Sequence, residues 1–133
     1  MSKDIRIKKG LDIKLVGVAE KTTTNSSQSS VYAVKPEDFH GIIPKLITKE
    51  GTEVKAGEAL FHSKSDPRIL FSSPVSGKVV AVERGARRKV LAVKITADAK
   101  QVYEDFGTKD ASTMSAEEVK NHLFTSGCWP FIK

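Results

Sequence analysis

The sequence predicts a mainly β domain, a compact sandwich or barrel, followed by one short α-helix. Between residues 42 and 95, short apolar segments alternate with turn signals such as 49–51, 55–57 and 84–85. Glycine permits a positive φ where the chain turns sharply and proline cannot donate to a central ladder, so this punctuation indicates corners between strands. The apolar segments are rich in β-branched residues and are too short for helices. After residue 110 the pattern changes to that of a single capped helix.

The length and composition allow one modest domain. The chain has 133 residues, of which 39% are hydrophobic, and its 22 Lys and Arg residues against 16 Asp and Glu residues give a net charge of +6. This is enough apolar material for one core, and the length excludes a large multidomain enzyme. Cys128 is the only cysteine. We therefore expect no internal disulfide framework and a reducing, cytoplasmic setting.

The predicted strands follow the apolar segments in order. Residues 5–7 and 11–15 alternate apolar and charged side chains, which predicts two short strands with a turn at Gly10 between them. The stretch 22–30 contains only Thr, Asn, Ser and Gln, and we expect an exposed loop there. The other predicted strands are 31–34, 60–61, 69–71, 79–82 and 90–95.

A capping box predicts where the helix begins. The hydroxyl of Ser115 can accept from the Glu118 N–H while the Glu118 carboxylate reaches back to the Ser115 N–H. A narrow apolar stripe follows, and Ser-Gly at 126–127 is a stop signal. The residues of the stripe are Ala116, Val119, Leu123 and Phe124.

These elements divide the chain into a β domain over 1–110 and a segment over 111–133 that holds the helix and an apolar linker. Because the apolar cluster 128–132 ends abruptly at Lys133, we expect it to lead into a longer parent chain. The charged N-terminus predicts no secretory signal, and the longest strongly apolar run, 79–82, is far below the roughly 20 residues that cross a bilayer. Any membrane role would be peripheral.

The residues that carry most enzyme chemistry are too scattered to predict a catalytic or metal site. His40, His62 and His122 do not stand at metal-ligand spacings. Cys128 lies among apolar residues, which predicts a buried structural cysteine rather than a nucleophile. The glycines form neither a dinucleotide fingerprint nor a P-loop, and the two tyrosines have no basic neighbours at strand spacing. We therefore expect no catalytic residue, no metal, no cofactor and no nucleic acid on this chain.

One basic cluster is the candidate contact with a partner or a membrane. It consists of Arg84, Arg87, Arg88 and Lys89, and it falls where a hairpin tip is predicted between two apolar strands. Such a tip could dock on an acidic protein partner or on lipid headgroups. The alternative is a solvated turn that keeps two hydrophobic strands from aggregating. Four further basic residues near the N-terminus could add to the positive electrostatic potential of this cluster: Lys3, Arg6, Lys8 and Lys9.

Two segments resemble biotinyl and lipoyl carrier domains. Residues 50–61 and 73–79 follow the carrier pattern EGDxVxxGxxL and then SPxxGxV, which implies a barrel-sandwich hybrid. In true carriers the modified lysine stands on the hairpin tip between these motifs, and here that place falls on Asp66 or Pro67. Lys64 is nearby but off the tip in this register. A carrier modified on Lys64 is the alternative function.

Nearly the whole chain resembles the N-terminal region of proteins of the NqrA family. These proteins are components of the bacterial sodium-translocating NADH:quinone reductases. The related RnfC-type electron-transport proteins share the barrel less closely. Carrier domains lack the opening IxIKKGLDI-like segment, the RGARR-like hairpin and the GxWPF-like ending. The matching segments are 5–13, 36–44, 50–51, 57–61, 71–77, 84–88 and 126–131.

This resemblance implies a peripheral component on the cytoplasmic side of the bacterial inner membrane. The family's complex oxidises NADH, reduces ubiquinone or a related quinone, and exports sodium ions, with flavins and an iron-sulfur centre held by other subunits. NqrA has been associated with quinone binding, so a quinone contact is implied for the full-length protein, although no matched motif assigns it to a residue. For this fragment the resemblance implies assembly and docking with the other subunits rather than catalysis.

Overall fold

The computed structural model describes residues 10, 16–25 and 27–132. The two strands predicted at 5–7 and 11–15 lie outside the described residues, and so do the four basic residues near the N-terminus. Within the predicted loop at 22–30, the described residues are all exposed and none belongs to a strand or helix.

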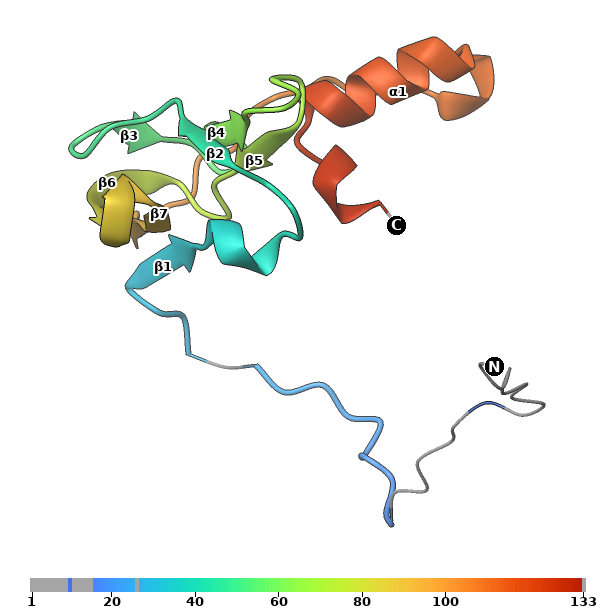
Figure 1. Cartoon of the computed structure of the whole chain (residues 1–133). Coiled ribbons are helices and arrows are strands. Elements are labelled where there is room, and N and C mark those ends of the chain that lie inside the picture. The colour runs from blue at the N-terminus through green and yellow to red at the C-terminus, as the bar shows by residue number, and fades with distance from the viewer. Residues whose placement is uncertain (1–9, 11–15, 26, 133) are drawn as a thin grey trace, which may run out of the picture.

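Two antiparallel sheets form the body of the molecule (Figure 1). One sheet has the strand order β1-β7-β6-β3 and the other has the order β2-β4-β5. In the described part of the chain, one α-helix, α1 (Ala116–Thr125), follows the sandwich, and single-turn 3₁₀ helices connect several elements. The strands are β1 (Val31–Val34), β2 (Pro44–Leu46), β3 (Glu53–Val54), β4 (Ala59–Ser63), β5 (Leu70–Ser72), β6 (Gly77–Arg84) and β7 (Val90–Ala97). The 3₁₀ helices are η1 (Pro36–Asp38), η2 (Ala86–Arg88), η3 (Ala111–Thr113) and η4 (Trp129–Phe131).

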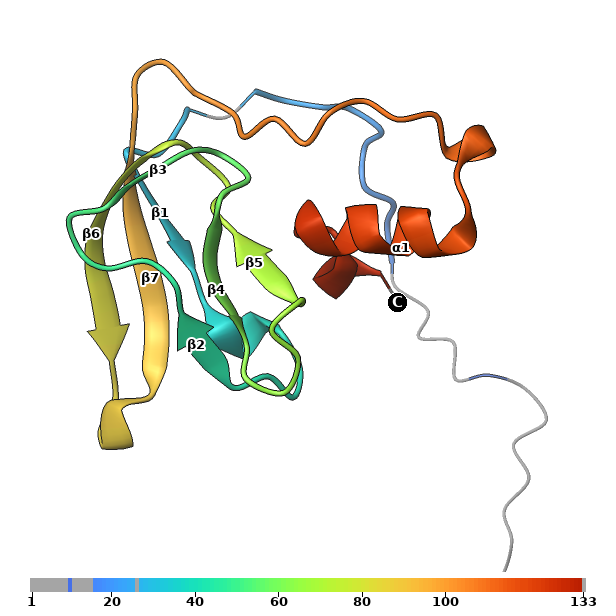
Figure 2. The same ribbon diagram turned by 90° about the horizontal axis from the view of Figure 1, so that it is seen from above.

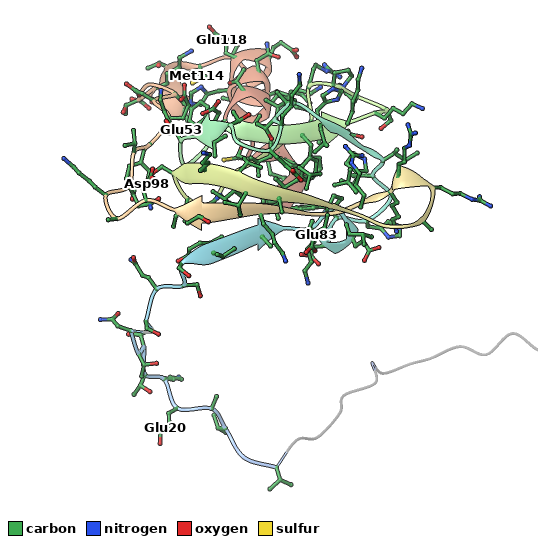
Figure 3. The ribbon with its side chains drawn as sticks, turned by 90° about the vertical axis from the view of Figure 1, so that its left-hand side faces the viewer. Glu20, Glu53, Glu83, Asp98, Met114 and Glu118 are labelled. Carbon is green, nitrogen blue, oxygen red and sulfur yellow. The ribbon has the colours of Figure 1, made fainter. Side chains whose placement is uncertain are left out.

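The core lies between the two sheets, which Figure 3 shows as two layers with Glu83 outside the larger sheet and Glu118 beyond the smaller one. Phe61 of β4 and Phe71 of β5 stack with their ring centroids 4.8 Å apart. Burying a side chain of this size stabilises the fold by about 1.5–3 kcal/mol. The side chains that are almost completely buried include Leu60, Phe61, Phe71, Val79, Val93 and Ile95. All belong to strand segments that the apolar pattern predicts.

Gly77 is the glycine that the sandwich depends on most. It pairs with Val54 on one side and with Ala97 on the other, at the crowded start of β6. Its φ is 154°, and a β-carbon there would lie 1.9 Å from the carbonyl oxygen of Thr96. Only a residue without a side chain fits this close approach of two strands.

The α1 boundaries confirm the prediction from sequence. The Glu118 N–H donates to the Ser115 Oγ at 3.3 Å, and the Ser115 N–H donates to the Glu118 Oε2 at 2.8 Å. At the other end, Gly127 has a φ of 69° and the N–H of Cys128 reaches the carbonyl of Leu123 at 3.1 Å, as in a Schellman motif. The helix therefore starts and stops where its capping residues dictate.

The apolar stripe of α1 is narrower than predicted. Phe124 is buried and its ring lies 4.3 Å from that of Trp129, whereas Ala116 is exposed. The prediction that Cys128 is buried was wrong, because this residue is exposed. It stands just after the Schellman glycine, where the chain turns away from α1, and Trp129 rather than Cys128 packs against the helix.

Candidate functional site

Two hairpin tips carry the candidate functional residues. The β4–β5 tip corresponds to the place where carrier domains are modified, and the β6–β7 tip carries the basic cluster. In Figures 1 and 2 the β6–β7 tip lies on the far side of the sandwich from α1. The two tips can therefore serve different purposes.

The β4–β5 tip is a tight turn over residues 66–69. The N–H of Ile69 donates to the carbonyl of Asp66 at 3.1 Å, which places Pro67 and Arg68 at the centre of the turn. This arrangement follows from the sequence, because Asp is favoured at the first position of such a turn and Pro at the second. Lys64 lies before the turn, where its backbone N–H donates to the carbonyl of Ile43 at 2.8 Å.

Asp66 holds Arg68 in a fixed orientation. The carboxylate accepts from the Arg68 backbone N–H and Nε, each at 3.0 Å, and from Nη2 at 2.7 Å. These hydrogen bonds, chiefly those from the guanidinium, lower the pKa of Asp66 to about 2. The same guanidinium lies over the ring of Phe124, with its carbon 4.8 Å from the ring centroid. The tip is thereby joined to α1 of the same chain.

The β6–β7 tip contains η2, but its backbone is that of a turn rather than of a right-handed 3₁₀ helix, because Arg87 has a non-helical φ of 55° and ψ of 30°. In the turn over residues 86–89, the Lys89 N–H donates to the Ala86 carbonyl at 3.2 Å. Both central residues have positive φ, 55° for Arg87 and 61° for Arg88. Positive φ at both central positions is the hallmark of a type I′ turn, which favours Asn, Asp and Gly. The hairpin was predicted from sequence, but the left-handed conformation of its arginines was not.

The four cations of the basic cluster are all exposed, and they are not equivalent. Lys89 forms an ion pair with Glu37 of η1, with Nζ 2.7 Å from Oε1. The hydrogen bond and charge of Lys89 lower the pKa of Glu37. Arg84 donates from Nη1 to the carbonyl of Arg88 at 3.3 Å. Sequence spacing could not have predicted the partner of Lys89, which is 52 residues away.

A hollow of about 360 Å³ with a mixed polar and apolar lining adjoins the base of this hairpin. Phe39, Ile42 and Pro44 contribute apolar surface to it, while the paired Lys89 and Glu37 and the exposed His40 contribute polar groups. The hollow and the basic tip thus belong to one continuous surface, which we call the hairpin surface.

The histidines remain apart in the fold. His62 of β4 has its Nδ1 2.9 Å from the carbonyl oxygen of Ser63, His122 belongs to α1, and His40 lies in the turn after η1. Among residues 10, 16–25 and 27–132, no three His, Cys, Asp or Glu side chains gather in a way that could hold a metal ion. No strand in this described part runs through a glycine-rich turn into a helix. The helix found there is neither long nor apolar enough to cross a bilayer.

Residues 5–98 match the protein family described as the NqrA N-terminal barrel-sandwich hybrid domain. The chain belongs to this family. The barrel-sandwich hybrid implied by the carrier-like motifs is therefore confirmed, and so is the resemblance to NqrA. The NqrA-type chain is 34% identical over 131 residues to the NqrA component of the Na(+)-translocating NADH-quinone reductase of Yersinia pestis and 31% identical to that of Haemophilus influenzae. Each match covers 97% of this chain, which spans only 29% of the length of those relatives.

Proposed function

We propose that this NqrA-type domain serves assembly and docking in a sodium-translocating NADH:quinone reductase, and that it carries no swinging cofactor. The observation behind this proposal is the β4–β5 tip, where the Arg68 guanidinium donates a hydrogen bond to Asp66 and lies over the ring of Phe124. A carrier needs a modified lysine on a free tip that can move between active sites. Here the tip offers Pro67 and Arg68 and is occupied by contacts with α1.

The proposal extends to the complex that the relatives' names describe. In it, the domain sits peripherally on the cytoplasmic side of the bacterial inner membrane and contacts other subunits of the reductase. NADH, flavins, an iron-sulfur centre and quinone belong to the rest of the complex, and no residue of this domain acts on them. The hairpin surface supplies the docking contact, because the β6–β7 tip lies on the far side of the sandwich from α1 (Figures 1 and 2).

The rival function is a lipoyl or biotinyl carrier modified on Lys64. The exposure of Lys64 favours it, since an exposed amine could reach a ligase. Its position before the turn, with the backbone held by Ile43, argues against it. A related RnfC-type electron-transport protein is a second alternative, and it predicts different co-purifying partners.

Expression of the tagged chain in its native host tests these functions together. Docking predicts that reductase subunits co-purify from gently extracted membranes and that the intact mass of the chain is unmodified. An added lipoyl or biotinyl mass on Lys64 without reductase subunits would instead establish the carrier function. A Lys64→Arg variant is the matched control, because it removes the acceptor amine and keeps the charge.

A further inference from the structure

The two central residues of the β6–β7 turn occupy a conformation that their side chains disfavour. A β-carbon crowds the neighbouring carbonyl when φ is positive, so residues such as Arg adopt this region at a cost in stability. Arg87 at 55° and Arg88 at 61° do so consecutively. An Asn-Gly pair would satisfy the same turn with less strain.

Contacts within the domain do not account for these two arginines. Both side chains are exposed. In the described part of the chain, neither guanidinium takes part in a hydrogen bond or an ion pair, and only the backbone carbonyl of Arg88 is engaged, by Arg84. Strained residues that the fold itself does not use are typical of binding sites.

We infer that Arg87 and Arg88 bind carboxylates on an acidic protein surface, presented by another component of the reductase. This inference rests on the proposed docking function and names the chemistry of the partner. A guanidinium forms two parallel hydrogen bonds with a carboxylate, which a lysine cannot do. The tight turn fixes the backbone of both arginines, so less conformational freedom is lost when the partner binds.

The same surface is poorly suited to a lipid bilayer. Stable electrostatic binding to anionic lipid takes a cluster of about four to eight free cations. Of the four cations here, Lys89 is paired with Glu37, so three remain without an ion pair in the described part of the chain, fewer than such a cluster needs. Insertion into a membrane would need a bulky apolar side chain at the tip, where the chain has Gly85 and Ala86.

The hollow at the base of the hairpin completes the recognition surface. Protein interfaces combine an apolar centre with a polar rim, and the strongest contacts are large side chains that fill pockets. Phe39, Ile42 and Pro44 form the apolar part of this hollow, beside the Lys89–Glu37 ion pair. The geometry fits a partner loop that carries an apolar residue beside two or more carboxylates.

The inference is tested by replacing Arg87 and Arg88 with Asn-Gly, the sequence that a type I′ turn prefers. The variant R87N/R88G keeps the type I′ backbone and removes both guanidinium groups. Its melting temperature rises by a few degrees because the strain is relieved, while the yield of reductase subunits that co-purify from native-host membranes falls at least tenfold. The control K100Q/K109Q removes the same number of charges from exposed loop positions and leaves that yield unchanged.

The outcomes separate the inference from the function on which it rests. If the unaltered chain recovers no other reductase component, the docking function fails. If the unaltered chain and R87N/R88G recover the subunits equally, docking stands and the arginine inference is overturned. It is also overturned if R87N/R88G recovers the subunits normally but no longer sediments with phosphatidylcholine vesicles that contain phosphatidylglycerol, because the tip would then bind lipid. Recovery that weakens as salt is added supports the inference.

Discussion

The guanidinium of Arg68 lies over the ring of Phe124, with its carbon 4.8 Å from the ring centroid. Arg68 stands on the β4–β5 tip and Phe124 on α1, so this contact joins the sandwich to the helix that follows it. Gly127 allows the end of α1 to approach β5 closely at this junction, because a β-carbon there would lie 2.3 Å from the hydroxyl oxygen of Ser72 in β5. The tip that is mobile in a carrier is thus part of the packing of this domain.

The first prediction concerns this junction. Replacing Arg68 by Ala removes both the cation–π contact and the hydrogen bonds to Asp66, and we expect amide hydrogen exchange to accelerate in α1 while β6 and β7 stay protected. In Arg68→Lys, amide exchange in α1 should be faster than in the unaltered chain and slower than in Arg68→Ala, since lysine retains the charge but lacks the planar guanidinium. Unchanged exchange in α1 for Arg68→Ala would show that the helix is held by other contacts.

The second prediction concerns acid stability. The pKa of Asp66 is lowered from 3.8 to about 2 by its hydrogen bonds with Arg68. A carboxylate with a depressed folded-state pKa stabilises the fold above its unfolded pKa, and this contribution is lost as the pH falls through the folded value. Stability should therefore decline between about pH 4 and pH 2. Urea unfolding over this range should show a shallower decline for Asp66→Asn, and equal slopes for the two proteins would contradict the assignment.

The third prediction compares two glycines of β6 and its turn. Gly77→Ala places a methyl group against the Thr96 carbonyl at a positive φ, and we expect a loss on the order of 3 kcal/mol or more, or failure to fold. Gly85→Ala is the control, because its φ is negative and the atoms nearest to the new methyl group belong to the side chain of Leu91, at 3.2 Å, rather than to the backbone. Thermal unfolding of both variants decides the matter, and a Gly77→Ala protein as stable as Gly85→Ala would refute the packing argument.

The fourth prediction concerns the helix cap. Ser115→Ala removes the side-chain acceptor of the capping box and should destabilise α1 by about 1 kcal/mol. Circular dichroism during thermal unfolding measures this loss. Glu117→Gln changes an exposed residue of the same helical turn outside the box, so its effect should be smaller. Equal effects of the two substitutions would mean that charge at the helix start matters more than the cap.

Sequence patterns predicted the local features well. Short β-branched segments became strands, and the Ser115–Glu118 box and the glycine at 127 fixed the ends of α1, because each depends on neighbours within a few residues. The hairpin that carries the basic cluster was predicted for the same reason.

Relationships between distant residues could not be predicted from the sequence. The pairing of Lys89 with Glu37 and the contact of Arg68 with Phe124 join residues more than fifty positions apart. The exposure of Cys128 depends on which way the chain leaves α1, and its apolar neighbours suggested the opposite. The left-handed arginines have no sequence signal, since Arg-Arg is not a preferred pair for this turn.

The most direct test of the assembly function is the co-purification of reductase subunits with the tagged chain from native-host membranes. We expect mass spectrometry to identify other subunits of a sodium-translocating NADH:quinone reductase, and the chain itself to have its unmodified mass. Recovery of the chain without those subunits, with a lipoyl or biotinyl group on Lys64, would contradict it.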